Sequence, residues 1–151
     1  MKKAFVIIFT ALAFAAVASA QPKAIGLRGG WGAHLSYEHY LGGENFLEID
    51  GGLYGLSTYE FGGTVTYNFM IARPNWTPRG QWGFYLGPGV NVGTWHNDAG
   101  NRAINLGLCV QVGLEYTFWF PLNLSLDIRP GWGFMSHVID YYPALAIRYA
   151  F

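Results

Sequence analysis

The most reactive residue types of this chain are His34, Ser36 and Glu38, which occupy every second position of one short segment. A serine with a histidine and a carboxylate is the side-chain set of an acyl hydrolase, and near a bilayer it would suit a lipid A deacylase. Alternate residues of a β-strand share a face but lie about 7 Å apart, which is too far for a direct proton relay. Ser136 and His137 form a second, poorer set. We therefore predict no catalytic residues and keep the deacylase as the least favoured alternative.

The sequence predicts no metal, cofactor or nucleic-acid site. The histidines are His34, His39, His96 and His137. Their spacing, with no cysteine or carboxylate in support, is not that of metal ligands. The glycine pairs Gly29-Gly30 and Gly87-Pro88-Gly89 do not precede a helix with a Lys and a Ser or Thr, so they do not indicate phosphate binding. Nine basic residues balance nine acidic ones, which leaves no basic surface for nucleic acid.

A second group of charged residues recurs on one face of otherwise apolar segments. Its members are Arg28, Glu38, Glu48, Asp50, Glu115, Asp127, Arg129 and Arg148. We predict that this lumen charge network fills the inside of a narrow barrel, where arginines bridge carboxylates and plug the interior. The alternative is a polar path for ions or very small solutes, which would favour cations because the acids outnumber the arginines.

Segments with strict two-residue alternation must position these charges. The clearest are 104–118 and 122–134, and the final segment 141–151 ends in the aromatic residue Phe151. Each has one face of large apolar residues and another of glycine, small polar and charged residues. Alternation over about ten residues is typical of strands that cross an outer membrane and is longer than most soluble strands require.

The beginning of the chain predicts export. Lys2 and Lys3 precede the apolar run 4–17, which ends at Ala18-Ser19-Ala20, so we expect residues 1–20 to be a cleaved signal peptide. No later run is long enough for a membrane-spanning helix, and only 12% of the residues are charged. Since lipid is spanned only by helices or closed barrels, we predict an outer-membrane β-barrel over residues 21–151. The competing fold is a secreted soluble β-sandwich or lipocalin-like barrel, with its apolar residues inside.

The predicted fold class is all-β: an eight-stranded antiparallel up-and-down transmembrane barrel, apolar outside, with a polar and glycine-rich lumen. Residues 24–41 fit either one long strand or a hairpin, and we choose the hairpin because an even strand number brings both ends to the periplasmic side. The connection 96–102 then faces outward. Pro88 removes a ladder hydrogen bond, so we expect a bulge or bend there. The predicted strands are 24–30, 34–41, 45–55, 59–71, 81–95, 103–119, 122–135 and 141–151.

Aromatic residues gather near the predicted strand ends. Amphipathic rings settle at headgroup depth and form girdles around membrane barrels. The predicted girdle consists of Trp31, Trp76, Trp82, Trp119, Trp132, Tyr149 and Phe151.

Several stretches resemble small outer-membrane β-barrel proteins of Bacteroidetes-type bacteria. They are Ile25–Trp31, Leu35–Leu41, Tyr85–Val90, Gly113–Phe118 and Pro121–Asp127. The resemblance covers nearly all of the chain after residue 20. It implies an eight-stranded barrel of the OmpA-like kind in the cell outer membrane, and it carries over no catalytic residues. The outer loops here are shorter than is usual in that family, which argues against a receptor role.

From these observations we expect a structural, envelope-supporting barrel without catalytic activity, cofactor or metal. A narrow ion or small-solute channel is the first alternative. The expected partners are outer-membrane lipids and the barrel-assembly machinery, which would act on the C-terminal strand ending in Phe151. We expect a monomer. The sequence does not identify a ligand or a physiological process.

Overall fold

The computed structural model describes residues 23–54, 60–96, 99–135 and 139–151. The predicted signal peptide and the Ser136-His137 pair lie outside the described residues. No helix in the described part of the chain is long and apolar enough to cross a membrane.

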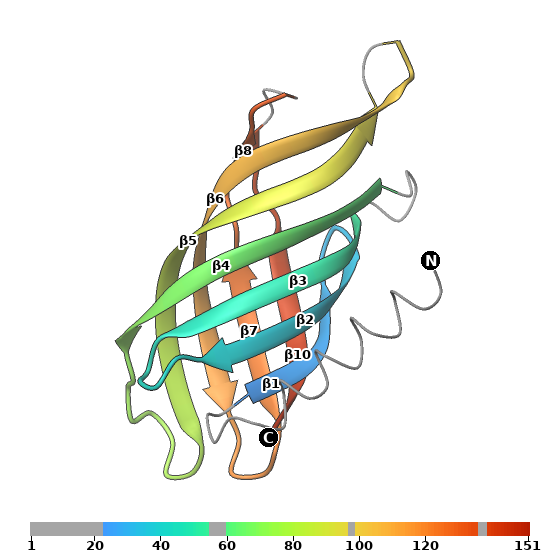
Figure 1. The fold of residues 1–151 in the computed structure, drawn as a ribbon. Coiled ribbons are helices and arrows are strands. Elements are labelled where there is room, and N and C mark those ends of the chain that lie inside the picture. The colour runs from blue at the N-terminus through green and yellow to red at the C-terminus, as the bar shows by residue number, and fades with distance from the viewer. Residues whose placement is uncertain (1–22, 55–59, 97–98, 136–138) are drawn as a thin grey trace.

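The described part of the chain contains ten β-strands, and Figure 1 shows how they are arranged. They are β1 (Lys23–Gly29), β2 (Ala33–Tyr40), β3 (Phe46–Tyr54), β4 (Glu60–Ala72), β5 (Gln81–His96), β6 (Arg102–Thr117), β7 (Asn123–Ile128), β8 (Gly131–Gly133), β9 (Ile139–Asp140) and β10 (Pro143–Ala150). β7 and β8 both pair with β6 and are separated only by residues 129–130, so they form one barrel strand. β9 pairs with β8 and β10 pairs with β7, so they form another. The wall is therefore an eight-stranded antiparallel barrel, as predicted.

Pairing between the first and last strands closes the barrel. Six residue pairs join β1 to β10, from Ala24–Ala150 to Gly29–Leu145. β1 also pairs with β2 from Lys23–His39 to Gly29–Ala33, which confirms the hairpin that the even strand number predicted. The two late strands are broken where the sequence alternation predicted continuous ones. The first break contains Pro130, which has no amide hydrogen for the ladder.

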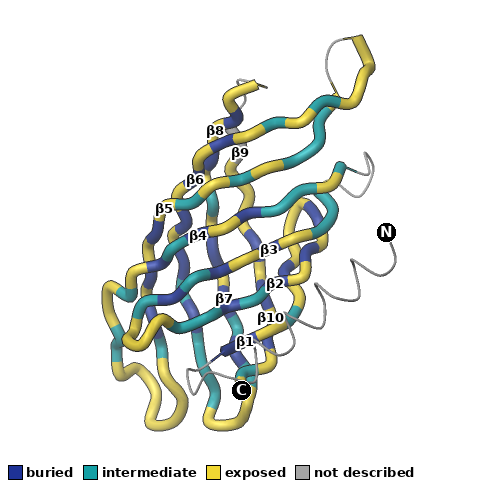
Figure 2. Tube along the Cα trace, in the orientation of Figure 1, coloured by how far each residue is buried: buried dark blue, intermediate teal, exposed yellow. Residues whose placement is uncertain are grey.

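Buried and exposed residues alternate along the strands of the wall (Figure 2), and the two sets differ in chemistry. Leu106, Leu108 and Leu126 face outward and are 57%, 54% and 56% exposed, whereas Asp127 is 3% exposed. The buried residues inside are mostly polar or charged. This arrangement confirms the predicted apolar exterior and polar lumen, and it excludes the alternative of a soluble barrel with an apolar interior.

The bulge that was predicted at Pro88 is absent there. Thr66 pairs with Gly89 and Phe69 with Leu86, so the register of β4 against β5 is the same on both sides of Pro88. The irregularity lies instead between Met70 and Ala72. The β4–β5 pairs skip residues 87 and 88, whereas Pro88 does pair with Val110 of β6. The missing donor of Pro88 therefore interrupts the pairing on one side without shifting the register.

Glycines inside the barrel make room for large rings. A Cβ on Gly113 would lie 2.2 Å from the Tyr85 ring, and one on Gly62 would lie 2.4 Å from the Tyr54 ring. Tyr85 is 1% exposed and packs edge-on against Phe46, with ring centroids 5.1 Å apart. At these two positions the absence of a side chain therefore leaves space for an aromatic ring.

Candidate functional site

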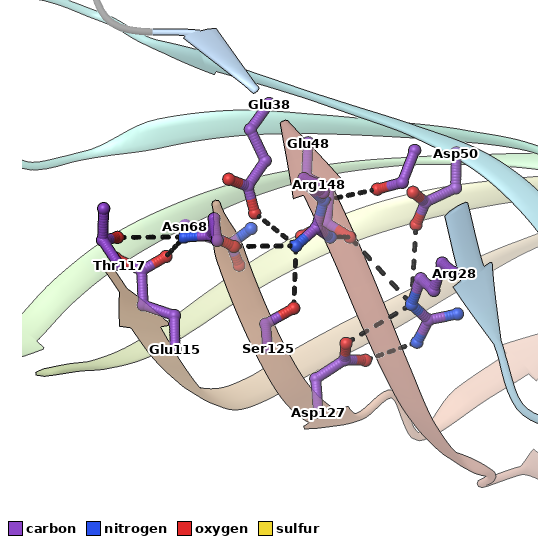
Figure 3. A network of polar contacts seen from close by, with 12 residues as sticks. Arg28, Glu38, Glu48, Asp50, Asn68, Glu115, Thr117, Ser125, Asp127 and Arg148 are labelled. Atoms are coloured by element: carbon purple, nitrogen blue, oxygen red, sulfur yellow. Dashed lines mark hydrogen bonds and ion pairs between the residues drawn. The ribbon is translucent and has the colours of Figure 1, made fainter. Parts of the chain in front are cut away.

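Glu48 of β3 lies at the centre of the charge network in the lumen (Figure 3). Its Oε1 is 2.8 Å from Nη2 of Arg148 and 3.0 Å from Nη2 of Arg129. Nε of Arg28 is 4.0 Å from the same oxygen. Gln111 Nε2 donates a hydrogen bond of 2.9 Å to Oε2. Since these partners come from β1, β6, β10 and the link between β7 and β8, the contacts of one carboxylate cross the lumen.

Arg148 joins two further walls to this centre. Its side chain is fully buried, and its Nη1 lies 2.9 Å from Oε1 of Glu38 on β2. Nε donates to Ser36 Oγ at 2.9 Å, and Nη1 donates to Ser125 Oγ at 2.7 Å. The strand pairing explains the contact with Ser36: Gly26 of β1 is opposite both Arg148 and Ser36, so no side chain separates the two.

Arg28 and Arg129 share the remaining carboxylates. Arg28 donates hydrogen bonds from Nε and Nη2 to the carboxylate of Asp127, the paired fork that the sequence predicted. Nη1 of Arg129 is 2.7 Å from Oδ2 of Asp50, and Nε of Arg28 is 3.8 Å from the same oxygen. Each guanidinium thus faces at least two carboxylates, and the positive charge of the lumen is compensated.

Glu115 lies at the edge of this network, and Asn123 links it to the centre, because the Asn123 side chain also accepts a hydrogen bond of 3.5 Å from Arg148 Nη1 (Figure 3). Tyr40 donates to Glu115 Oε1 at 3.3 Å, and Asn123 donates to Oε2 at 3.5 Å. Nη1 of Arg73 lies 4.0 Å from Oε1 of Glu115, and its Nε lies 3.2 Å from Glu44. Arg73 is absent from the predicted network, because it follows β4 in a connection without alternation and the sequence gives no signal for the direction of its side chain.

An amide and hydroxyl cluster fills the space beside Glu48. Thr66 donates to Gln111 Oε1 at 2.6 Å, and Asn68 donates to the same oxygen at 3.2 Å. All three residues are fully buried. The two-residue alternation of the sequence also puts Thr66, Asn68 and Gln111 on the polar face of their segments, but these uncharged side chains are not part of the predicted charge network.

The hydrolase set is not assembled. Ser36 Oγ accepts a hydrogen bond from Arg148, and Glu38 pairs with the same guanidinium. The His34 ring instead packs edge-on against Tyr54, with centroids 4.6 Å apart, and has no hydrogen bond to Ser36 among the described residues. Ser36 is also fully buried in the lumen, away from the apolar outer surface of the barrel, where an acyl chain would be expected.

Most predicted girdle residues lie exposed on the outside. Trp31, Trp76, Trp119 and Trp132 are 63%, 59%, 63% and 53% exposed, and Tyr149 and Phe151 are 57% and 54% exposed. Trp82 is half-buried because its ring contacts Trp76 and Tyr116 at centroid distances of 5.4 and 4.7 Å. At the opposite end, Trp31 stacks on Tyr142 at 5.0 Å.

Within the described ranges, no group of three or more His, Cys, Asp or Glu side chains is placed to hold a metal ion. The ion pairs and hydrogen bonds of the charge network link facing walls of the barrel and fill the lumen with paired charges.

Comparison with known proteins supports the fold. No protein-family model matches the chain. No curated protein matches its sequence. The structure is similar to the crystal structure of the N-terminal β-barrel domain of Pseudomonas aeruginosa OprF, with a TM-score of 0.66 and 12% sequence identity, over 87% of this chain and 96% of that chain. The likeness agrees with the predicted OmpA-like barrel fold, whereas the resemblance to Bacteroidetes-type proteins stays a prediction.

Proposed function

We propose that this chain is an integral outer-membrane β-barrel that supports the envelope mechanically and has a plugged lumen without catalytic activity. The apolar exterior, the exposed aromatic residues at the strand ends and the predicted export signal support the location. The likeness to the OprF barrel domain supports the same type of barrel. Lipid would cover the exposed apolar face. In water, an apolar face of this kind would need a partner to cover it.

The observation that carries the plugged lumen is the set of contacts between Arg148, Glu48 and Glu38. These fully buried side chains join β10 to β3 and β2 at 2.8 and 2.9 Å. An ion could pass only by separating such pairs, and breaking one buried pair costs about 3–5 kcal/mol. A path of this kind would open rarely, which favours the structural role over the channel.

Planar-bilayer recording tests the plug. The wild-type barrel should show no discrete openings, whereas Arg148→Ala, which removes the side chain that bridges the lumen, should show cation-selective steps. Arg102→Ala changes an exposed arginine at the start of β6 and should behave as the wild type. Discrete cation-selective openings of the wild-type barrel would contradict the structural role and establish the channel.

Fractionation tests the location. The chain should stay in the membrane after extraction with detergent-free buffer, and detergent-extracted protein should migrate differently on a gel before and after heating. Release into buffer, with one migration position, would contradict an integral barrel.

We further propose that the barrel-assembly machinery acts on the C-terminal strand. Phe151 donates its backbone N–H to the Lys23 carbonyl at 2.7 Å, and Lys23 donates to the Phe151 carbonyl at 2.9 Å, so the last residue closes the seam between the first and last strands. Deletion of Phe151 should slow the appearance of heat-modifiable protein in cells.

We also propose that the barrel is a monomer, and light scattering of the purified barrel should give the mass of one chain.

A further inference from the structure

A continuous row of aromatic side chains lies at the end of the barrel where β5 begins and β6 ends. Each ring contacts the next, with centroid distances between 4.6 and 6.0 Å. The rings come from β5, β6 and the connections 73–80 and 118–122, at the same end as the C-terminus (Figure 1). Trp76 and Trp119 are 59% and 63% exposed, so the row is part of the outer surface. We call this set the aromatic row; its members are Trp76, Trp82, Tyr116, Phe118, Trp119 and Phe120.

Arg79 is held beside the aromatic row. Its backbone carbonyl accepts hydrogen bonds of 2.8 Å from the Tyr116 hydroxyl and of 2.8 Å from the Thr77 hydroxyl. The next residue, Gly80, has a φ of 71°, and a Cβ there would lie 2.4 Å from Tyr116 Oη, so this approach requires glycine. The guanidinium carbon of Arg79 lies 5.9 Å from the centroid of the Trp119 ring, a distance at which a cation and an aromatic face attract each other.

The charge of Arg79 has no carboxylate partner within the described part of the chain. The acids Glu44 and Glu115 lie at this end, but the arginine that contacts them is Arg73, at 3.2 Å and 4.0 Å. Arg79 is also exposed, so its N–H donors are available at the surface. A guanidinium can donate two parallel hydrogen bonds to a phosphate group, and tryptophan and tyrosine rings settle at headgroup depth.

The wall next to the aromatic row offers a surface for acyl chains. Beyond the row, the outward-facing pairs along β5 and β6 are Phe84–Leu114 and Leu86–Val112. Phe84, Leu86 and Val112 are 38%, 42% and 44% exposed. Cation, amphipathic rings and apolar wall therefore follow one another in the same order as the phosphate, the glycerol region and the acyl chains of a phospholipid.

We propose that Arg79 and the aromatic row form a binding site for one anionic phospholipid. Its phosphate oxygens accept hydrogen bonds from Arg79, and its acyl chains lie along the apolar wall of β5 and β6. A zwitterionic lipid binds less well, because the ammonium group of its own headgroup already compensates the phosphate. This inference rests on the proposed membrane location and adds to it the class of lipid and the place where it binds, which is the periplasmic side in the predicted orientation.

Native mass spectrometry of the full barrel tests the site. The barrel is released from neutral detergent micelles that contain equal amounts of phosphatidylglycerol and phosphatidylcholine with the same acyl chains. The one-to-one adduct with phosphatidylglycerol should exceed that with phosphatidylcholine about fivefold, and Arg79→Gln should reduce this ratio to about one. Trp119→Leu keeps an apolar side chain but removes the ring beside the guanidinium, so the ratio should fall about two- to fivefold.

Arg102→Gln is the matched control, because it removes the same charge from an exposed position at the opposite end of the barrel and should keep the wild-type ratio. Three results would overturn the site: equal adducts of the two lipids on the wild-type barrel, an unchanged ratio in Arg79→Gln, or the same fall in Arg102→Gln, which would mean that the lipid follows net charge. Heat-modifiable migration confirms that each variant is folded. Its absence from the wild-type chain would contradict the integral barrel itself, so failure of the site and failure of the proposed location are distinguishable.

Discussion

Replacement of Arg148 by methionine should be the most damaging single change in the lumen. The guanidinium is fully buried and lies 2.9 Å from Glu38 and 2.8 Å from Glu48. Glu48 would keep Arg129 at 3.0 Å. Glu38 has no other ion-pair partner among the described residues, so it would become a buried, uncompensated charge.

The expected loss follows from that stranded carboxylate. Breaking a buried pair by removing one partner costs about 3–5 kcal/mol, which is a large part of the 5–15 kcal/mol or so that stabilises a typical domain. Arg148→Met should therefore lower the free energy of unfolding by about that amount. In the double variant Arg148→Met/Glu38→Gln, no charge is stranded at position 38, and about 1–2 kcal/mol should be recovered relative to additive single changes.

Urea unfolding in lipid vesicles, followed by tryptophan fluorescence, measures both quantities. Arg102→Met removes an exposed arginine and should change stability by no more than about 0.5 kcal/mol. A loss under about 1 kcal/mol for Arg148→Met, or strict additivity in the double variant, would refute the account of Glu38 as the stranded charge.

Two further changes test the packing and the lipid-facing surface in the same unfolding assay. Gly113→Ala places a methyl group against the Tyr85 ring and should lower the free energy of unfolding by about 1–3 kcal/mol. In the control Gly51→Ala, the new methyl group meets no atom within 4 Å, so stability should hardly change. Equal effects of the two changes would contradict the packing of Tyr85 against Gly113. Val112→Lys, in the middle of the apolar band, should cost about 2–4 kcal/mol in bilayers, and Ile104→Lys, near the outer end of β6, about 0–1 kcal/mol. The same cost at both depths would argue against a membrane around this face.

The alternation of the sequence was sufficient to predict the wall of the barrel. Each strand of such a barrel has an apolar outer face and a polar face toward a narrow lumen, so the period of two fixes which way Leu108 and Asp127 point without knowledge of the register. The even strand number resolved the hairpin in residues 24–41, and the β1–β2 pairing confirms it. Pro88 shows the limit of single-residue rules, since a missing donor can be accommodated on one side of a strand while the other side stays paired.

The partners inside the lumen could not be predicted, because they depend on the stagger between strands. Glu48 and Arg148 are a hundred positions apart, and only the closed barrel brings them to 2.8 Å. The alternation gives the direction of a side chain but not its height along the barrel axis. The alternation therefore identified the charged residues of the network but not their partners. It did not predict that Glu48 is central, or that Glu115 contacts Arg73 and Tyr40.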